Sequence, residues 1–391
     1  MSLANLVAQR RILVCVGSGG VGKTTTAASL GLAGARAGRR TLVLTIDPAK
    51  RLANALGLSS LGHDLQSVPA EKVALGGAPV SGSLDAMMLD QKRAFDEIVV
   101  KYAKDPAARK RIFENRIYQQ ISSTLAGSHE YAAMAKLHEI VQTHKYDLII
   151  LDTPPTANAL DFLDAPERLT AAIDSSAIQW FTKPYLAAGR FSLKALGLGA
   201  SFVLKRLARF VGSAFLEDMA QFFVEFNAIL GGFRERAKEV FDLLRGSDVG
   251  FVLVSSAEPL SIDEAIYFHD RLVASHMPLG AFVVNRVHSA APTTAAMMNR
   301  EGLIAKLQAR PELVGYSGDD MVQIASDLDR THREFQQLAD IDARQVQQLR
   351  DRSRGKLEVI TIPFFDQDIY DVSGLSQMIR YLVGEDAKSA A

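Results

Sequence analysis

The chain has 391 residues, which is longer than most single domains, so one large domain with insertions or two domains are expected. Its 44 basic residues balance its 44 acidic residues, and this balance gives no support to a broad nucleic-acid-binding face. Its single cysteine, Cys15, excludes an internal disulfide and a thiolate cluster, and it suits a reducing compartment.

The sequence carries no recognisable export or membrane signal. Residues 1–11 lack the long apolar core of a signal peptide. The longest strongly apolar stretch in the middle of the chain, Ala195–Leu204, is too short to span a bilayer. We therefore expect a cytoplasmic protein.

Short runs rich in valine, isoleucine and leucine recur along the chain, each followed by a polar or glycine-containing turn. They are apolar throughout, which is typical of parallel strands buried on both faces. The runs are Ile12–Val16, Thr41–Ile46, Leu148–Leu151, Phe251–Val254, Ala281–Val284 and Leu357–Ile362, with Leu84–Leu89 as a further candidate. Helical segments separate them. The pattern predicts an α/β fold with a doubly wound, mostly parallel sheet of about seven or eight strands and helices on both faces.

Two long stretches, residues 90–145 and 160–245, have helical character and no strand signal. They predict a helical subdomain inserted into a single domain that spans residues 1–391. Between residues 321 and 350, apolar side chains recur at three- and four-residue steps in a very polar background. That spacing predicts a surface helix or a short helical hairpin.

A phosphate-binding loop is predicted directly after the first strand and before a helical run. Its residues fit the pattern G-x-x-x-x-G-K-[ST] at every fixed position: Gly17, Ser18, Gly19, Gly20, Val21, Gly22, Lys23 and Thr24. Glycines let backbone N–H groups converge on phosphate oxygens, and the helix N-terminus adds its dipole. Lys23 is expected to reach the β- and γ-phosphates, Thr24 to bind Mg²⁺ through its hydroxyl, and Thr25 to donate to the α-phosphate. The sequence thus predicts an ATP and Mg²⁺ site.

The same residues also match the dinucleotide fingerprint G-x-G-x-x-G, with Asp47 placed as a ribose-binding acid would be. That fingerprint needs neither a cation nor a hydroxyl at its end. Lys23 and Thr24 therefore favour the triphosphate interpretation.

Two further strand ends carry aspartates. Asp47 follows the second strand, and Asp152 ends the apolar run that begins at Leu148. The carboxyl ends of parallel strands share the sheet edge that carries the phosphate loop, so both carboxylates can reach the γ-phosphate side. We predict Lys23, Asp47 and Asp152 as catalytic residues, and Thr24, Asp47 and Asp152 as the Mg²⁺ site. The alternative for each aspartate is a helix cap or a turn residue.

These segments, in this order, resemble the arsenite-pump ATPase (ArsA) family. The resemblance rests on the phosphate loop, on T-x-D-P-A at Thr45–Ala49 and on D-T-x-P-T at Asp152–Thr156. It extends to Ser255–Ser261, Val283–Arg286 and Pro363–Phe365, each of which follows a strand. The family includes the ATPase of guided entry of tail-anchored proteins and has relatives in MinD, ParA and the nitrogenase iron protein.

The resemblance implies roles for particular residues. Asp47 corresponds to the switch I aspartate, which orients the attacking water, and Asp152–Thr156 to switch II, which senses the γ-phosphate. Asn285 would read the adenine edge, with Arg286 beside it. Pro363 and Phe364 would flank the base.

Ser18 stands where the family usually has a lysine that crosses a dimer interface to the partner's phosphates. Serine cannot supply this charge, so either hydrolysis is slow or another cation, Lys50 or Arg51, replaces it. Arg51, just beyond Asp47, is the favoured candidate, and a surface or adenine-side arginine is the alternative. Because no cysteine follows Arg286, the zinc clasp of the tail-anchored-protein relatives is excluded. The arsenite-pump relatives bind metalloid through three thiols, and a chain whose one cysteine is Cys15 cannot form such a site.

The chain has one phosphate loop, so we expect it to pair with a second copy or with a paralogue. The favoured function is an ATPase whose dimer opens and closes on a hydrophobic helix client or a membrane-protein partner. Its support is the aromatic stretch Trp180–Leu244 with Met87, Met88 and Met219, although these side chains could instead pack the subdomain's own core.

Two other functions stay open. The first is the cytosolic ATPase subunit of an anion transporter, which rests on the resemblance alone. The second is a MinD- or ParA-like positioning switch, which ranks last because those proteins lack large helical insertions and the end of this chain is not basic. No nucleic-acid partner is expected.

Overall fold

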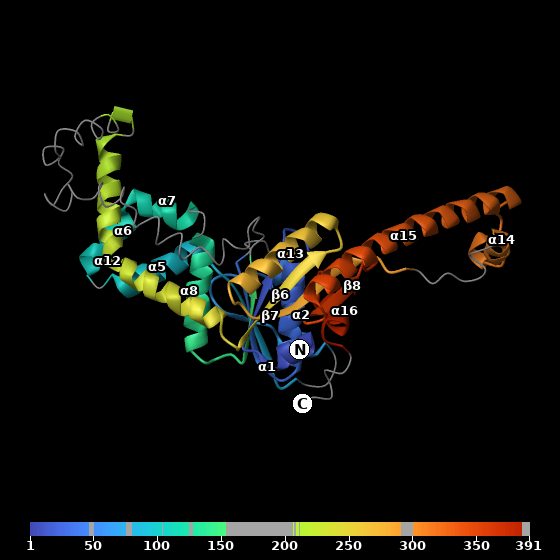
Figure 1. The fold of residues 1–391 in the computed structure, drawn as a ribbon, viewed down its shortest axis with the longest axis horizontal. Coiled ribbons are helices and arrows are strands. Elements are labelled where there is room, and N and C mark those ends of the chain that lie inside the picture. The colour runs from blue at the N-terminus through green and yellow to red at the C-terminus, as the bar shows by residue number, and fades with distance from the viewer. Residues whose placement is uncertain are drawn as a thin grey trace.

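A central sheet of eight strands organises the protein (Figure 1). The computed structural model describes residues 1–46, 51–75, 80–103, 105–124, 128–153, 206, 209–210, 212–290 and 300–384. The strand order is β3-β4-β2-β5-β1-β6-β7-β8, and only the β3–β4 pair is antiparallel. The predicted doubly wound, mostly parallel sheet is therefore confirmed. The strands are β1 (Ile12–Val16), β2 (Arg40–Thr45), β3 (Gln66–Ser67), β4 (Ser83–Met88), β5 (Leu148–Asp152), β6 (Val249–Ser256), β7 (Leu279–Val287) and β8 (Glu358–Pro363).

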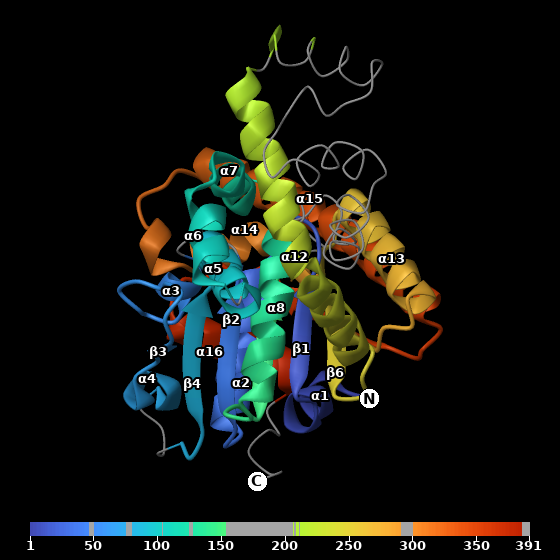
Figure 2. The ribbon, with the colours of Figure 1, turned by 90° about the vertical axis from the view of Figure 1, so that its left-hand side faces the viewer.

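Helices cover both faces of the sheet, and each face has its own apolar core (Figure 2). The first layer consists of α1 (Leu3–Gln9), α2 (Lys23–Arg36), α3 (Arg51–Ala55), α4 (Ala70–Ala74) and α16 (Val372–Val383). The second consists of α5 (Gln91–Tyr102), α6 (Pro106–Glu114), α7 (Arg116–Thr124), α8 (Ser128–Gln142), α12 (Ser213–Leu244), α13 (Pro259–Ala274) and α15 (Gly318–Ser353). None of the described helices is both long and apolar enough to cross a membrane.

Helix α2 lies unusually close to the sheet because its inner face is made of small residues. A Cβ at Gly31 would overlap the Val43 side chain of β2, and one at Gly34 would overlap Leu148 of β5. Ala27, Ala28 and Ala35 are also buried on this helix. The close approach fixes the start of α2 against the carboxyl ends of the strands, where the predicted phosphate loop lies.

Helices α5, α6, α7, α8 and α12 gather at one end of the molecule (Figure 1). Phe222 and Phe226 of α12 are buried, and their rings stack at a centroid distance of 5.0 Å. These two aromatics therefore pack the core of the helical group. Met87 and Met88 lie in β4, with Met87 buried, so they belong to the sheet and not to a helical groove. Trp180 and the other aromatics before residue 206 lie outside the described residues.

Helix α15 runs for 36 residues and projects from the body (Figure 1). It begins with a capping box between Ser317 and Asp320. Its last turns, with Val346 and Leu349 buried, pack on the sheet side, and its first turns pack beside α14 (Arg300–Gln308), which precedes the 3₁₀ turn η1 (Pro311–Leu313). Residues 321–350 thus lie in one continuous helix.

Candidate functional site

The loop between β1 and α2 is built on three glycines with positive φ, Gly17, Gly20 and Gly22. A Cβ at Gly17 would overlap the carbonyl oxygen of Val254, and one at Gly22 would overlap the Asn285 side-chain amide. Gly22 is also the N-cap of α2, and among the described residues no side chain caps this helix start. The first N–H groups of α2 are therefore available to an anion.

Lys23, the first residue of α2, is held against the loop it follows. Its Nζ donates to the Ser18 carbonyl oxygen at 2.7 Å, and the residue is only 6% exposed. Half-buried Thr24 and Thr25 follow in the same helical turn. The loop thus brings one ammonium, two hydroxyls and a helix N-terminus together, a donor set that fits a polyphosphate.

Asp152, fully buried at the end of β5, connects the loop to the neighbouring strands. Its Oδ2 accepts hydrogen bonds from the Thr24 hydroxyl at 2.8 Å and from the Thr45 hydroxyl of β2 at 2.9 Å. A hydroxyl has one hydrogen and two lone pairs. Because the Thr24 hydrogen points to Asp152, its oxygen lone pairs face elsewhere and can bind a cation. A hydroxyl oxygen beside a carboxylate is the donor set that Mg²⁺ prefers.

The same carboxylate affects Cys15, its register partner on β1. Burial raises the pKa of the Cys15 thiol far above its usual range, the Asp152 charge raises it further, and Lys23 lowers it slightly. The hydroxyl of Thr153 donates to the Cys15 carbonyl oxygen at 2.8 Å and so fixes the chain just beyond Asp152. The raised pKa keeps the thiol protonated near neutral pH.

Several predicted residues of the switch segments lie outside the described residues, namely Asp47, Lys50 and Pro154–Thr156. Arg51 begins α3 immediately after the first of these segments, and its side chain is exposed. Ser18, at the position of the family's interface lysine, lies 3.3 Å through its Oγ from the Oγ of Ser261 on α13. The serine hydroxyl therefore meets a helix of its own chain.

Asn285 in β7 supports the loop. Its Nδ2 donates to the carbonyl oxygen of Val21 at 3.0 Å, and the residue is 9% exposed. The next residue, Arg286, has φ 59°, at the point where the β7–β8 register shifts. Such a bulge redirects side chains beside a site.

A cavity of about 370 Å³ lies beside the phosphate loop, on the side of β6, β7 and β8. Loop residues, the start of α13 and the ends of the last two strands line it, and Asn285 is not among them. The lining residues are Gly19, Gly20, Val21, Ser256, Ala257, Glu258, Ser261, Arg286, His288, Asp342 and Phe364. Arg286 and Phe364 line this cavity, and Pro363 ends β8 next to Phe364. The predicted role of Pro363 and Phe364 beside a base stays a prediction.

Four residues of this site are given no role by the sequence: Thr45, Ser261, His288 and Asp342. Thr45 and Ser261 lie in segments that carry the family resemblance, whereas His288 has no spacing that marks it. Asp342 does leave a signal, because it sits seven residues from Phe335 and seven from Leu349, an apolar position on a helix. A carboxylate on such a stripe indicates a buried polar contact.

Comparison with known proteins gives consistent matches. A family profile described as "Anion-transporting ATPase" matches residues 10–308. The ATPase GET3 of Malassezia globosa is 26% identical over 289 residues, which cover 73% of this chain and 76% of the relative. The ATPase get3 of Aspergillus terreus is 26% identical over 292 residues, with the same coverage. A putative arsenical pump-driving ATPase of Halobacterium salinarum is 31% identical over 170 residues, 41% of this chain and 24% of the relative.

Proposed function

This chain belongs to the anion-transporting ATPase (ArsA) family, and we propose that it hydrolyses Mg·ATP to open and close a dimer that acts on a hydrophobic helix client. The ATPase activity follows from the family and its relatives. The observation that carries the proposed site is the pair of hydroxyls, Thr24 and Thr45, that share the buried Asp152 carboxylate beside the phosphate loop.

Each residue of the phosphate loop and the strand ends has its own proposed role toward ATP and Mg²⁺. Lys23 exchanges its bond to the Ser18 carbonyl for the β- and γ-phosphates, and the α2 N–H groups bind the remaining oxygens. Asp152 keeps the Thr24 hydroxyl oriented so that its oxygen faces the metal. Mg²⁺, when bound, neutralises developing charge on the phosphates. Asp47 orients the attacking water, and Arg51 supplies the positive charge that Ser18 lacks.

A chain of polar contacts supports transmission from the nucleotide to the helical group. His63, in the segment after α3, is 9% exposed, and its Nδ1 accepts the Asp90 backbone N–H at 3.2 Å. The hydrogen of a neutral His63 ring therefore sits on Nε2, which lies 3.2 Å from Glu97 Oε1 on α5. The segment that follows Asp47 is in this way tied to α5.

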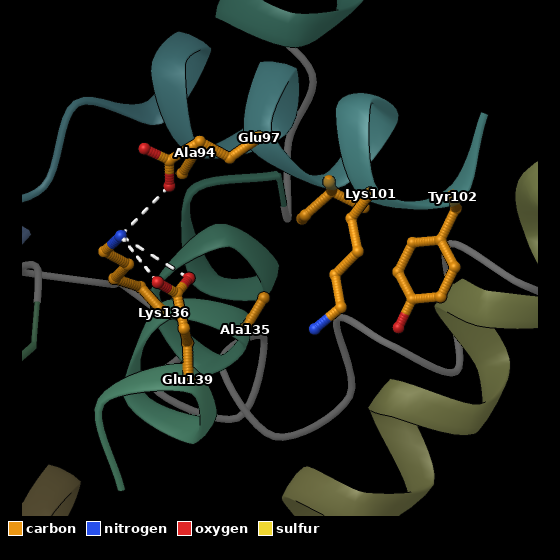
Figure 3. A pocket seen from close by; sticks show the side chains of 8 residues that line it. Ala94, Glu97, Lys101, Tyr102, Ala135, Lys136 and Glu139 are labelled. Atoms are coloured by element: carbon orange, nitrogen blue, oxygen red, sulfur yellow. Dashed lines mark hydrogen bonds and ion pairs between the residues drawn. The ribbon is translucent and has the colours of Figure 1, made fainter. Parts of the chain in front are cut away.

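The Glu97 carboxylate also connects α5 with α8. The Nζ of Lys136 donates to Glu97 at 3.0 Å and to Glu139 at 3.3 Å, next to a small hollow between α5 and α8 (Figure 3). Lys101 and Tyr102 of α5 also line this hollow (Figure 3). A shift of α3 on loss of the γ-phosphate would move His63 and, through it, Glu97. The packing of α5 against α8 would then change.

Phe215, in the first turn of α12, and Phe210, which precedes the helix, offer apolar surface to a client. Phe210 is 82% exposed and Phe215 is 40% exposed, whereas Phe222 and Phe226 of α12 are buried. An amphipathic or transmembrane helix binds to such a surface through its apolar face. The Halobacterium relative is named a putative arsenical pump-driving ATPase. An ATPase triggered by thiol-bound metalloid is less well supported for this chain, because its one thiol, Cys15, is buried in β1.

The proposal is tested with Asp47→Asn, which should retain ATP and stall hydrolysis. We expect this variant to sediment as a dimer with Mg·ATP and as a monomer with ADP or with Lys23→Ala added. A transmembrane-helix peptide should bind in one of the two nucleotide states only. Equal sedimentation in all nucleotide states would contradict the proposed opening and closing of a dimer. Peptide binding that does not depend on the nucleotide would contradict the proposed action on a hydrophobic helix client.

A further inference from the structure

The cavity beside the phosphate loop lies on the side where the nucleoside of ATP must be. Asp152, the predicted metal carboxylate, is on β5, and the strand order places β1 between β5 and β6. The γ-phosphate end of the nucleotide therefore points toward β5. The nucleoside leaves the loop on the other side of β1, where Arg286 of β7 and Phe364, directly after β8, line the cavity. Its volume of about 370 Å³ is in the range of small-molecule sites.

His288, directly after β7, is the residue of this cavity whose ring is held most firmly. Its ring stacks on Phe364 at a centroid distance of 5.2 Å and an interplanar angle of 15°. Phe335 of α15 meets it edge to face at 5.5 Å. The Phe364 backbone N–H donates to the Val287 carbonyl oxygen at 3.0 Å, which keeps the two rings in register. Such packing leaves the ring one orientation.

Asp342 of α15 determines how this ring presents its nitrogens. Its Oδ2 accepts the His288 backbone N–H at 2.7 Å and the ring Nδ1 at 2.8 Å, and the residue is 8% exposed. A carboxylate only accepts hydrogen bonds, so the hydrogen of a neutral ring sits on Nδ1. The second polar atom of the ring, Nε2, is then a hydrogen-bond acceptor.

We infer that His288 is a specificity-determining residue of the nucleotide site, and that its Nε2 accepts a hydrogen bond from the 6-amino group of adenine. Asp342 is its positioning residue, because it fixes the ring and its tautomer through the hydrogen bonds to the His288 backbone N–H and Nδ1. A purine with an oxygen at position 6 presents an acceptor to this acceptor and is rejected. This inference rests on the proposed ATP site.

The test compares the binding of ATP with that of ITP, which carries an oxygen in place of the amino group at position 6 of the purine. Titration calorimetry at about pH 8.5 measures both affinities, because imidazoles are ordinarily neutral at this pH. The unmodified chain should bind ATP about tenfold more tightly than ITP. His288→Phe keeps an aromatic ring against Phe364 but removes the acceptor, so it should bring the ratio close to one.

Asp342→Leu separates positioning from base contact. It removes the one oxygen that accepts both the His288 backbone N–H and Nδ1–H, so the ring hydrogen can move to Nε2 and the ATP/ITP ratio should fall as it does for His288→Phe. Two-dimensional ¹H–¹⁵N spectra of the imidazole should report the changed tautomer. Asp340→Leu, at an exposed residue on the same helix, is the matched control and should leave both readouts unchanged.

Three results would overturn the inference. One is an unchanged ATP/ITP ratio in His288→Phe. The second is an unchanged tautomer and ratio in Asp342→Leu. The third is an effect of His288→Phe that vanishes with 2′-deoxy-ATP, because the ring would then contact the ribose. None of these three results contradicts the proposed ATP site. That proposal is contradicted only if the unmodified chain binds no ATP or binds it independently of Lys23.

Discussion

At the scale of single residues, Asp152 connects the phosphate loop, β2 and β5 through one oxygen atom. Thr24 and Thr45 both donate to its Oδ2, so the carboxylate orients the hydroxyl that is proposed to bind Mg²⁺. An amide in its place could still accept one of these hydrogen bonds, but it would lack the negative charge. The metal-binding and the structural contributions of this residue can therefore be separated.

We predict that Asp152→Asn lowers kcat by about 100-fold or more, because charge stabilisation by the metal is lost. ATP binding without Mg²⁺ should change little. The measurement is steady-state ATPase activity over a Mg²⁺ series. Asp147→Asn, five positions earlier and exposed, is the control and should retain activity; equal activity in both variants would contradict the assigned role.

Cys15 provides a second residue-scale prediction. Burial and the Asp152 charge raise the pKa of its thiol, so almost no thiolate exists in the folded state near neutral pH. A disulfide reagent such as Ellman's should label the native chain slowly and the chain in denaturant at once. Fast labelling of the native chain at its single cysteine would show that β1 is not packed as described.

At the scale of elements, the sequence predicts the strands well where apolar runs are continuous. β1 has the predicted bounds, whereas β6 extends past Phe251–Val254 to Val249–Ser256, because glycine and serine interrupt the apolar pattern without ending the pairing. β3 has two residues and no pattern of its own. Tertiary pairing, not local propensity, makes it a strand.

The residues of the site also fall into two groups, those that local motifs predict and those that only the packing brings together. The loop glycines, Lys23, Thr24 and Asp152 follow from motifs that are local in the sequence. The contacts of His288 with Asp342 and Phe335 come from the packing of α15 beside the end of β7, and no local motif predicts them. Asn285 shows the limit of transferring a role: its amide nitrogen, predicted to read adenine, donates to Val21 in the loop. Its role toward the base stays a prediction.

The ion pair between Arg40, at the start of β2, and Asp147, before β5, predicts a pH effect on these elements. Hydrogen bonds from Arg40 lower the pKa of Asp147 to about 2. A carboxyl with a depressed pKa stabilises the fold above its unfolded pKa, and this contribution is lost as the pH falls from about 4 toward 2. Asp147→Asn should therefore be less stable at neutral pH, by less than about 1 kcal/mol because the pair is exposed.

Urea unfolding of both chains at several pH values measures this effect. The gap between their free energies of unfolding should narrow as the pH falls below about 4. A constant gap across that range would show that Asp147 contributes through something other than its charge.

At the scale of the whole molecule, the sheet that carries the proposed nucleotide site lies at the centre, and helices α5, α6, α7, α8 and α12 lie at one end (Figure 1). The contacts from His63 through Glu97 to Lys136 are the proposed link between them. Glu97 is central to this link, because its carboxylate contacts both His63 and Lys136. Its removal should uncouple the helical group from the nucleotide without disturbing the phosphate loop.

We predict that hydrogen exchange in α5 and α8 differs between the ATP and ADP states, and that Glu97→Ala abolishes the difference. ATP affinity should not change. Glu114→Ala, which removes an exposed pair with Lys110 on α6, is the matched control. Persistence of the nucleotide-dependent exchange in Glu97→Ala would place the coupling elsewhere.

The most direct measurement is calorimetric titration of the unmodified chain and of Lys23→Ala with Mg·ATP. Charge-assisted hydrogen bonds from the ammonium to two phosphates are lost in the variant, so its affinity should fall by about 100-fold or more. Circular dichroism must show that the variant is folded. If a folded Lys23→Ala chain binds Mg·ATP as tightly as the unmodified one, the triphosphate does not lie in the loop between β1 and α2.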